Sequence, residues 1–186
     1  MVTPPDPRQP SADYLALVRT PPSRLAGVLR RGGTPDIDAL TGWEWRGTNM
    51  PATSRLLGLR RFIKGFTVQG DAAAGYNVSV HGSDLASPWT PRNQRDGRRE
   101  WARFTVTPVD PAAADNRYLH ALLLDYGAIA SPESGIPGRL RDYLVRVVPD
   151  SDELLLGHAF LAAADARIPV GWFALERLGP IKTSPR

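Results

Sequence analysis

The fold of this chain is organised around Thr41-Gly42-Trp43-Glu44-Trp45-Arg46-Gly47, which holds two of its five tryptophans. Downstream of Lys64 the sequence adopts the period-two alternation of side chains that is typical of β-strands. We therefore interpret the tryptophan stretch as the first strand of a β structure, and the segments that follow as its neighbours.

Seven further segments show this alternation or a short apolar run, and Gly, Pro, Asn and Asp residues separate them. The predicted strands are 65–69, 76–80, 100–107, 117–126, 140–148, 153–162 and 170–178. Strands spaced mostly by about 8 to 12 residues favour an antiparallel sandwich or barrel over a parallel sheet. We predict a mainly β fold, an antiparallel barrel of about eight strands whose interior admits side chains or one small ligand.

Many of these strands are apolar on both faces, and 117–126 is the clearest case. Its two faces carry Tyr118, His120, Leu122, Leu124 and Tyr126 on one side, and Leu119, Ala121, Leu123 and Asp125 on the other. A solvated outer face would be more polar, so the extra apolar surface is expected to meet helices or a partner chain. A homodimer through such a face is one arrangement that the pattern allows.

Short helices are predicted before and beside the first strand. Ser11 caps a helix over 12–19, and Ser23 caps a second helix that ends at Gly32-Gly33. A third helix over 52–59 follows Pro51, with the cations Arg60, Arg61 and Lys64 at its C-terminal end. These helices are expected outside the barrel or over its mouth.

The chain divides into four predicted parts: a disordered tail at 1–10, a helical segment at 11–40, the barrel at 41–178 and a tail at 179–186. A length of 186 residues suits one domain with a sizeable core. No signal-peptide pattern and no apolar run long enough to span a bilayer is present, so we expect a soluble, cytoplasmic protein.

Composition excludes several kinds of chemistry. The chain has no cysteine, which rules out disulfides, thiol nucleophiles and thiolate metal sites. Its net charge of +4 comes from 21 arginines and only two lysines. An arginine cluster in the 92–103 region lacks aromatic platforms and nucleic-acid motifs, so a solvated loop is favoured over nucleic-acid binding. Phosphate-cradling, dinucleotide, serine-elbow and zinc-protease motifs are also missing.

Several short motifs resemble the GXWXG family of lipocalin-like, calycin-like barrels and its usual C-terminal companion domain. In order along the chain, they are Gly42, Trp45-Arg46-Gly47, 61–66, Leu124-Asp125, 141–147, Leu155-Leu156-Gly157 and 173–177. The resemblance covers about residues 40 to 178 and implies a lipocalin-like barrel. It also implies that Trp45 packs across the closed end of the barrel against Arg177, in a structural role. No catalytic residues are implied.

Three kinds of polar side chain are candidates for chemistry on the predicted strands. His120 and His158 lie in apolar segments, where a histidine serves as a general base, as a polar anchor or simply as a partner of a carbonyl. Asp142 is a strand carboxylate, for which a structural ion pair or a polar anchor beside Tyr143 is expected. The histidine spacing does not favour a metal site, and no cofactor is expected.

The candidate catalytic residues are therefore His120, His158, Tyr143 and Asp142, and the candidate ligand-binding residues are Tyr76, Trp101, Phe104, Tyr118, His120, Tyr143, His158 and Phe160. The first hypothesis is binding of a small hydrophobic molecule, such as a lipid, polyketide or terpenoid, in the barrel lumen. The second is a cofactor-independent cyclase or isomerase that uses the same cavity. The third is an interaction module that docks a partner through its apolar strands and basic loop.

Overall fold

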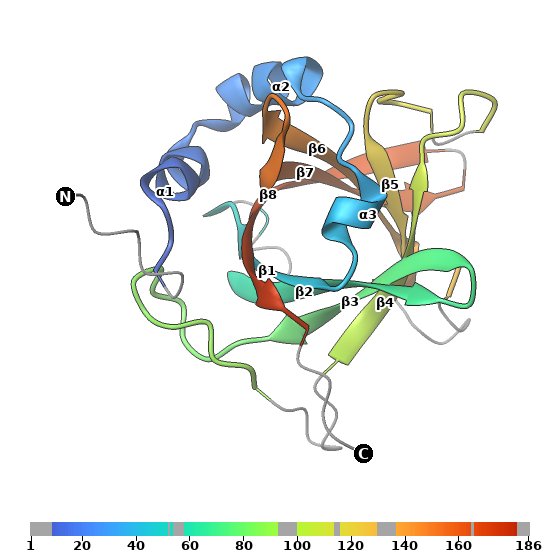
Figure 1. The fold of residues 1–186 in the computed structure, drawn as a ribbon. Helices are drawn as coiled ribbons and strands as arrows, with labels where there is room; N and C mark the ends of the chain where they lie inside the picture. Colours follow the sequence, from blue (N-terminus) through green and yellow to red (C-terminus); the bar gives the residue numbers. More distant parts are fainter. Residues whose placement is uncertain are drawn as a thin grey trace.

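The computed structural model describes residues 9–51, 53, 58–92, 100–113, 116–129, 137–164 and 166–181. Eight antiparallel strands follow one another in chain order and close into a barrel, as the pairing of the first strand with the last shows (Figure 1). The strands are β1 Trp43–Asn49, β2 Arg61–Gln69, β3 Ala72–Ser79, β4 Glu100–Pro108, β5 Leu122–Asp125, β6 Leu140–Val148, β7 Ser151–Ala163 and β8 Ala166–Pro180. The predicted fold class and strand number are confirmed.

The strand predicted over 117–126 is wrong in its first half. Only Leu122–Asp125 forms β5, and a turn precedes it, in which the amide of Ala121 donates to the carbonyl of Tyr118 at 2.9 Å. The partner strand β4 explains the boundary, because its pairing with β5 ends at Pro108, opposite Leu122. On the other side β6 continues past Leu144, but its Arg146 pairs with Gly33 instead of with the residues that precede Leu122.

Three helices precede the barrel among the described residues: α1 Ala12–Arg19, α2 Pro22–Arg31 and α3 Ile37–Leu40. α1 begins as predicted, with Ser11 Oγ accepting from the amide of Tyr14 at 3.1 Å. α2 begins earlier than predicted, with proline in its first turn, so Ser23 lies inside the helix and does not cap it. α3 was not predicted, and it is capped by Asp36.

Some predicted segments lie outside the described residues. They include most of the third helix predicted over 52–59, most of the tail at 1–10 and the end of the tail at 179–186. β2 begins at Arg61, four residues before the predicted strand over 65–69, so Lys64 lies within this strand. β8 runs through Gly179 to Pro180, so the barrel extends slightly beyond its predicted end.

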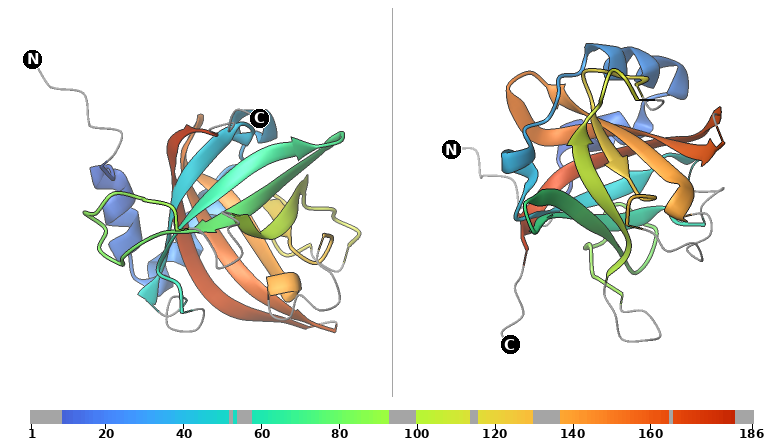
Figure 2. Two further views of the ribbon diagram at one scale, coloured as in Figure 1. Left: turned by 90° about the horizontal axis from the view of Figure 1, so that it is seen from below. Right: turned by 90° about the vertical axis from the view of Figure 1, so that its right-hand side faces the viewer.

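The apolar outer face is covered by helices of the same chain. α1 packs against β8, and α2 packs against β6 and β7, on one side of the barrel (Figures 1 and 2). Tyr14 and Leu29 are fully buried there against outward side chains such as Tyr143 and Val145. These helices are the reason why strands on this side of the barrel are apolar on both faces.

α3 lies at one end of the barrel, beside the start of β1 (Figure 1). Leu40 of α3 joins the inner cluster that contains Trp45, and the carbonyl of Ala39 accepts from Arg177 Nη2 at 3.1 Å. The inner cluster continues through Phe66, whose ring meets that of Trp45 edge-on with centroids 6.2 Å apart. This end of the lumen is therefore filled by side chains.

Candidate polar site in the barrel lumen

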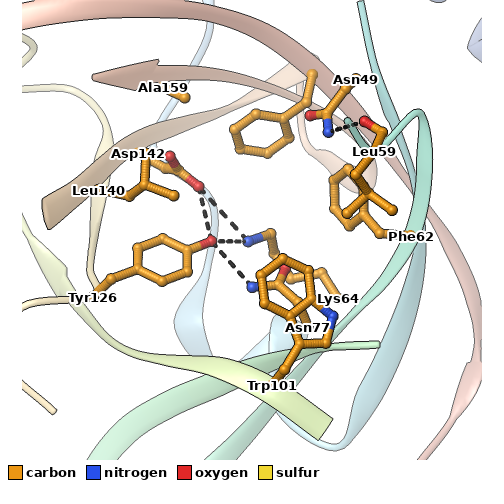
Figure 3. Close-up of a pocket in the computed structure, with 11 residues that line it drawn as sticks. Asn49, Leu59, Phe62, Lys64, Asn77, Trp101, Tyr126, Leu140, Asp142 and Ala159 are labelled. Carbon is orange, nitrogen blue, oxygen red and sulfur yellow. Dashed lines mark hydrogen bonds and ion pairs between the residues drawn. The ribbon is translucent and has the colours of Figure 1, made fainter. Parts of the chain in front are cut away.

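A cluster of four polar side chains lies inside the largely apolar lumen (Figure 3). Tyr126 Oη is its centre, because the hydroxyl accepts from Lys64 Nζ at 2.6 Å and from Asn77 Nδ2 at 3.3 Å. The same hydroxyl donates to Asp142 Oδ2 at 3.0 Å. Lys64 Nζ also lies 3.7 Å from Asp142 Oδ2, which makes the two groups an ion pair connected through the tyrosine.

Strand alternation brings these residues together from separate parts of the chain. On β2, Phe62, Lys64 and Phe66 point into the lumen, and Ile63 between them belongs to the outer cluster. Lys64 is opposite Asn77 of β3 in the register. Asp142 of β6 lies between Leu124 and Ala159 of the adjacent strands, and Tyr126 follows directly after the end of β5.

Aromatic rings surround the lysine amine on several sides. Nζ lies 4.3 Å from the centroid of the Phe104 ring, 5.4 Å from that of Phe173 and 5.7 Å from that of Phe62. The negative face of such a ring stabilises a cation by about 0.5–2 kcal/mol. The side chain of Lys64 is only 1% exposed, and the loss of hydration is the largest influence on its pKa.

Burial shifts both ionisable partners towards their neutral forms. It lowers the pKa of Lys64 to about 8, and the nearby Asp142 carboxylate offsets only part of this effect. Burial also raises the pKa of Asp142, against the opposing effect of the Lys64 ammonium. The pKa of Tyr126 is raised well above its usual value, again chiefly by burial. Both shifts lower the free energy of moving a proton from the amine to the carboxylate.

The cluster borders a cavity of about 40 Å³, which is room for a few water molecules or for one small functional group. Its lining residues are Asn49, Leu59, Phe62, Lys64, Asn77, Trp101, Tyr126, Leu140, Asp142, Ala159 and Phe173. Leu59 and Trp101 are partly exposed, so the lining reaches the surface on their side. Asp142 Oδ1 and Trp101 Nε1 are buried and have no hydrogen-bond partner among the described residues.

The structure separates the predicted site residues into two groups. Trp101 and Asp142 line the cavity, and Phe104 lies in the inner cluster beside Lys64. The remaining predicted residues lie on the outer side of the barrel wall or in the turn before β5: Tyr76, Tyr118, His120, Tyr143, His158 and Phe160.

The two histidines have structural surroundings. His158 stacks on Trp172 with centroids 3.8 Å apart, and burial together with Arg117 lowers its pKa to about 4. His120 Nε2 lies 2.9 Å from the carbonyl of Leu29, to which it donates when that nitrogen carries the proton. Neither histidine contacts the cavity lining through any hydrogen bond among the described residues, so the lumen chemistry rests on other groups.

Sequence reasoning missed Lys64, Asn77 and Tyr126 as site residues. A signal for Lys64 was present, because a lysine is rare in this arginine-rich chain and this one lies between Phe62 and Phe66 at period two. A charged residue at an inward strand position must be paired, and that requirement would have directed attention to it. Tyr126 and Asn77 carry no comparable local signal.

Arg177 lies over both tryptophans of the opening stretch, at the closed end of the barrel. Its guanidinium carbon is 5.1 Å from the Trp45 ring centroid and 4.6 Å from that of Trp43. Arg177 Nε also pairs with Glu153 at 2.8 Å, and the register places Arg177 directly opposite Trp45. Side chains therefore pack this end of the barrel, and the rings of Phe66 and Phe104 connect Trp45 to the Lys64 amine.

The buried pair predicts a pH dependence of stability. The double variant Lys64→Met/Asp142→Leu removes both groups. The difference in unfolding free energy between wild type and this variant therefore reports the contribution of Lys64 and Asp142 alone. Between the folded pKa of about 8 and the ordinary value of 10.5, the unfolded chain binds more protons at Lys64 than the folded one. Wild type should therefore gain stability relative to the variant as pH rises, by up to about 1.4 kcal/mol per pH unit.

Urea denaturation followed by tryptophan fluorescence at about pH 7.5, 8.5 and 9.5 measures this difference. A difference that stays flat or falls over this range would show that Lys64 titrates at its ordinary pKa.

The fold and the cluster together define a closed antiparallel barrel with a polar group in a small aromatic cavity of its lumen. Comparisons of the chain with protein-family models, with curated proteins and with solved structures found no match. None of the helices in the described part of the chain has the length and apolar character needed to cross a membrane.

Proposed function

We propose that this protein binds a small molecule through a carbonyl or similar polar group that enters the barrel lumen. The observation that carries the proposal is the unpartnered Asp142 Oδ1, which lies in the cavity wall beside the Lys64 amine. A buried polar atom without a partner costs about 1–3 kcal/mol. Burial favours the neutral form of Asp142, and Oδ1 of a neutral carboxyl donates to a bound carbonyl oxygen, which recovers that free energy. Aromatic walls with a few convergent polar groups are typical of small-molecule sites.

The size of the cavity narrows the class of ligand. Sites that enclose drug-sized ligands measure about 300–1,000 Å³, whereas this cavity measures about 40 Å³. A lipid, polyketide or terpenoid would place only a short polar end in the lumen, and its apolar body would extend past Leu59 and Trp101 towards the surface. A compact aldehyde or ketone fits the polar end of the cavity directly.

A cofactor-independent isomerase is a second candidate, favoured by the hydrogen-bonded path from Lys64 through Tyr126 to Asp142. Burial moves the pKa values of Lys64 and Asp142 towards neutral pH. Groups with such pKa values are suited to transferring a proton at a carbon next to a carbonyl. The candidate acid and base groups are then Asp142 and Lys64, and the outward Tyr143 and His158 have no role.

Binding is tested with 2-octanone, a linear ketone, by following amide chemical shifts in a ¹H–¹⁵N titration. We expect the shifts to change around Lys64, Asn77 and Tyr126. The variant Phe62→Trp narrows the cavity and should weaken binding by about tenfold or more, because a rigid side chain occupies space that the ligand needs.

The matched control is Val68→Trp, which introduces the same side chain on the same strand at a position that is 57% exposed. It should leave the affinity unchanged. Equal affinities for wild type and Phe62→Trp, or shifts confined to the outer face, would contradict binding in the lumen.

The same titration in D₂O, followed for exchange of the hydrogens next to the carbonyl, distinguishes catalysis from simple binding.

A further inference from the structure

We infer that Lys64 forms a covalent imine with a small aldehyde or ketone inside the lumen, an inference that rests on the proposed function. The geometry places the Lys64 amine in a cavity wall. Tyr126 Oη and Asp142 Oδ2 form a hydrogen-bonded chain that can accept its proton, and Asp142 Oδ1 has no partner among the described residues. The ligand is then a reactive carbonyl compound, and Lys64 Nζ is the atom that bonds to it.

The amine is held in a way that suits nucleophilic attack. Lys64 is the only lysine among the described residues, and its Nζ donates one short hydrogen bond, to Tyr126 Oη at 2.6 Å. Its distance of 3.7 Å from Asp142 Oδ2 exceeds that of a direct hydrogen bond. Its side chain is only 1% exposed and lies among aromatic rings, and this low hydration favours the uncharged amine.

A purely structural ion pair would be arranged differently. Buried carboxylates that serve only to neutralise a lysine are stabilised by further hydrogen bonds that satisfy both oxygens. Here Asp142 Oδ2 accepts from Tyr126, and Oδ1 is left without a partner in the described part of the structure although it is buried. The hydroxyl group of an amine–carbonyl adduct is a donor of the kind that Oδ1 lacks.

The reaction starts with a proton transfer along the cluster. The ammonium of Lys64 passes a proton to Tyr126 Oη as the tyrosine passes its own proton to Asp142 Oδ2, which leaves a neutral amine and a neutral carboxyl. Burial shifts the pKa values of Lys64 and Asp142 in the directions that favour this transfer.

Bond formation and loss of water follow. The lone pair of Nζ forms a bond to the carbonyl carbon as the C=O π electrons move to oxygen, which takes up the proton lost from nitrogen, and a carbinolamine results. The C–O bond then breaks, and the hydroxyl leaves as water with the proton supplied by Asp142. The nitrogen lone pair forms the C=N bond, so amine and carbonyl yield a protonated imine, a carboxylate and water, without any oxidation or reduction.

The test uses the intact chain, which contains only two lysines, Lys64 and Lys182. The protein is incubated with propanal and sodium cyanoborohydride near neutral pH, which reduces each imine to a stable propylamine. Peptide mass spectrometry then measures the fraction propylated at each lysine. The same labelling in guanidinium chloride provides the reference ratio, which should be about one because both lysines have ordinary pKa values in an unfolded chain.

We expect the folded protein to carry propyl groups on Lys64 at about tenfold or more the level on Lys182, because a pKa near 8 gives a far larger fraction of neutral amine. The adduct is mapped directly on the wild type, so the result does not depend on a variant that fails to fold. Phe62→Trp should lower labelling of Lys64 with no change at Lys182, and Val68→Trp should leave both unchanged.

Two outcomes overturn the inference, and they differ in what they say of the proposed function. If 2-octanone perturbs the lumen amides while Lys64 remains unlabelled in the folded protein, the barrel binds carbonyl compounds without bonding to them. If neither perturbation nor labelling occurs in the lumen, both the imine and the binding site are wrong.

Discussion

Replacing Asp142 with leucine is expected to lower the free energy of unfolding by about 3–5 kcal/mol at neutral pH. Among the described residues, Asp142 is the only acidic group within ion-pairing distance of Lys64, and its loss leaves the amine among aromatic rings, 1% exposed. It also deprives the hydroxyl of Tyr126 of its acceptor. Urea denaturation followed by tryptophan fluorescence measures the loss.

The double variant Lys64→Met/Asp142→Leu should recover most of this stability, because a buried ion pair replaced by apolar residues of similar volume costs little or nothing. Asp13→Leu is the control for the chemical change itself. Asp13 is exposed in the first turn of α1, where loss of its favourable interaction with the helix dipole costs less than about 1 kcal/mol. A double variant as unstable as Asp142→Leu alone would show that the two charges do not depend on each other.

Replacing Trp45 with alanine is expected to cost about 3–5 kcal/mol, the typical loss for a buried aromatic side chain. Trp45 is fully buried, meets Phe66 edge-on and lies under the guanidinium of Arg177 at the closed end of the barrel. Its removal leaves a cavity in the lumen beside β1, the strand whose pairing with β8 closes the barrel. The same denaturation experiment measures the change in the unfolding free energy.

Trp43→Ala is the matched control, two residues away on the same strand. Trp43 is partly exposed and also contacts Arg177, at 4.6 Å, so its removal deletes a cation–π contact without opening a cavity in the lumen. We expect it to destabilise the protein markedly less than Trp45→Ala. Equal losses for the two variants would indicate that the contact with Arg177, and not burial in the barrel, gives Trp45 its importance.

The strands that were predicted best are those in which alternation and turn chemistry agree. β6 has its predicted bounds of 140–148, and β4 extends only one residue beyond the predicted 100–107. β5 shows where local pattern fails, because a strand requires a neighbouring backbone as well as suitable side chains. The α1 boundary was predictable since Ser11 caps its own helix through a local hydrogen bond.

The polar site was predicted only in part for a related reason. Asp142 and Trp101 were identified as candidates, but the partners of Asp142, Tyr126 and Lys64, lie 16 and 78 residues before it in the chain. Period two tells which side chains share a face of a strand, and it does not tell which face is inward when both are apolar. On β7 this ambiguity led to His158 as a candidate for the lumen, although it stacks on Trp172 outside.

The sequence by itself determined the approximate positions of the strands, beginning with the stretch from Thr41 to Gly47, an antiparallel β fold of about eight strands and the absence of thiol chemistry. These properties follow from local periodicity, turn residues and composition. The tertiary structure alone decided which strand faces point inward, that α1 and α2 cover the outer face, and that Lys64, Tyr126 and Asp142 meet. The physical reason is that barrel closure brings together strands distant in sequence, and the burial that shifts the pKa of Lys64 exists only once the barrel has closed.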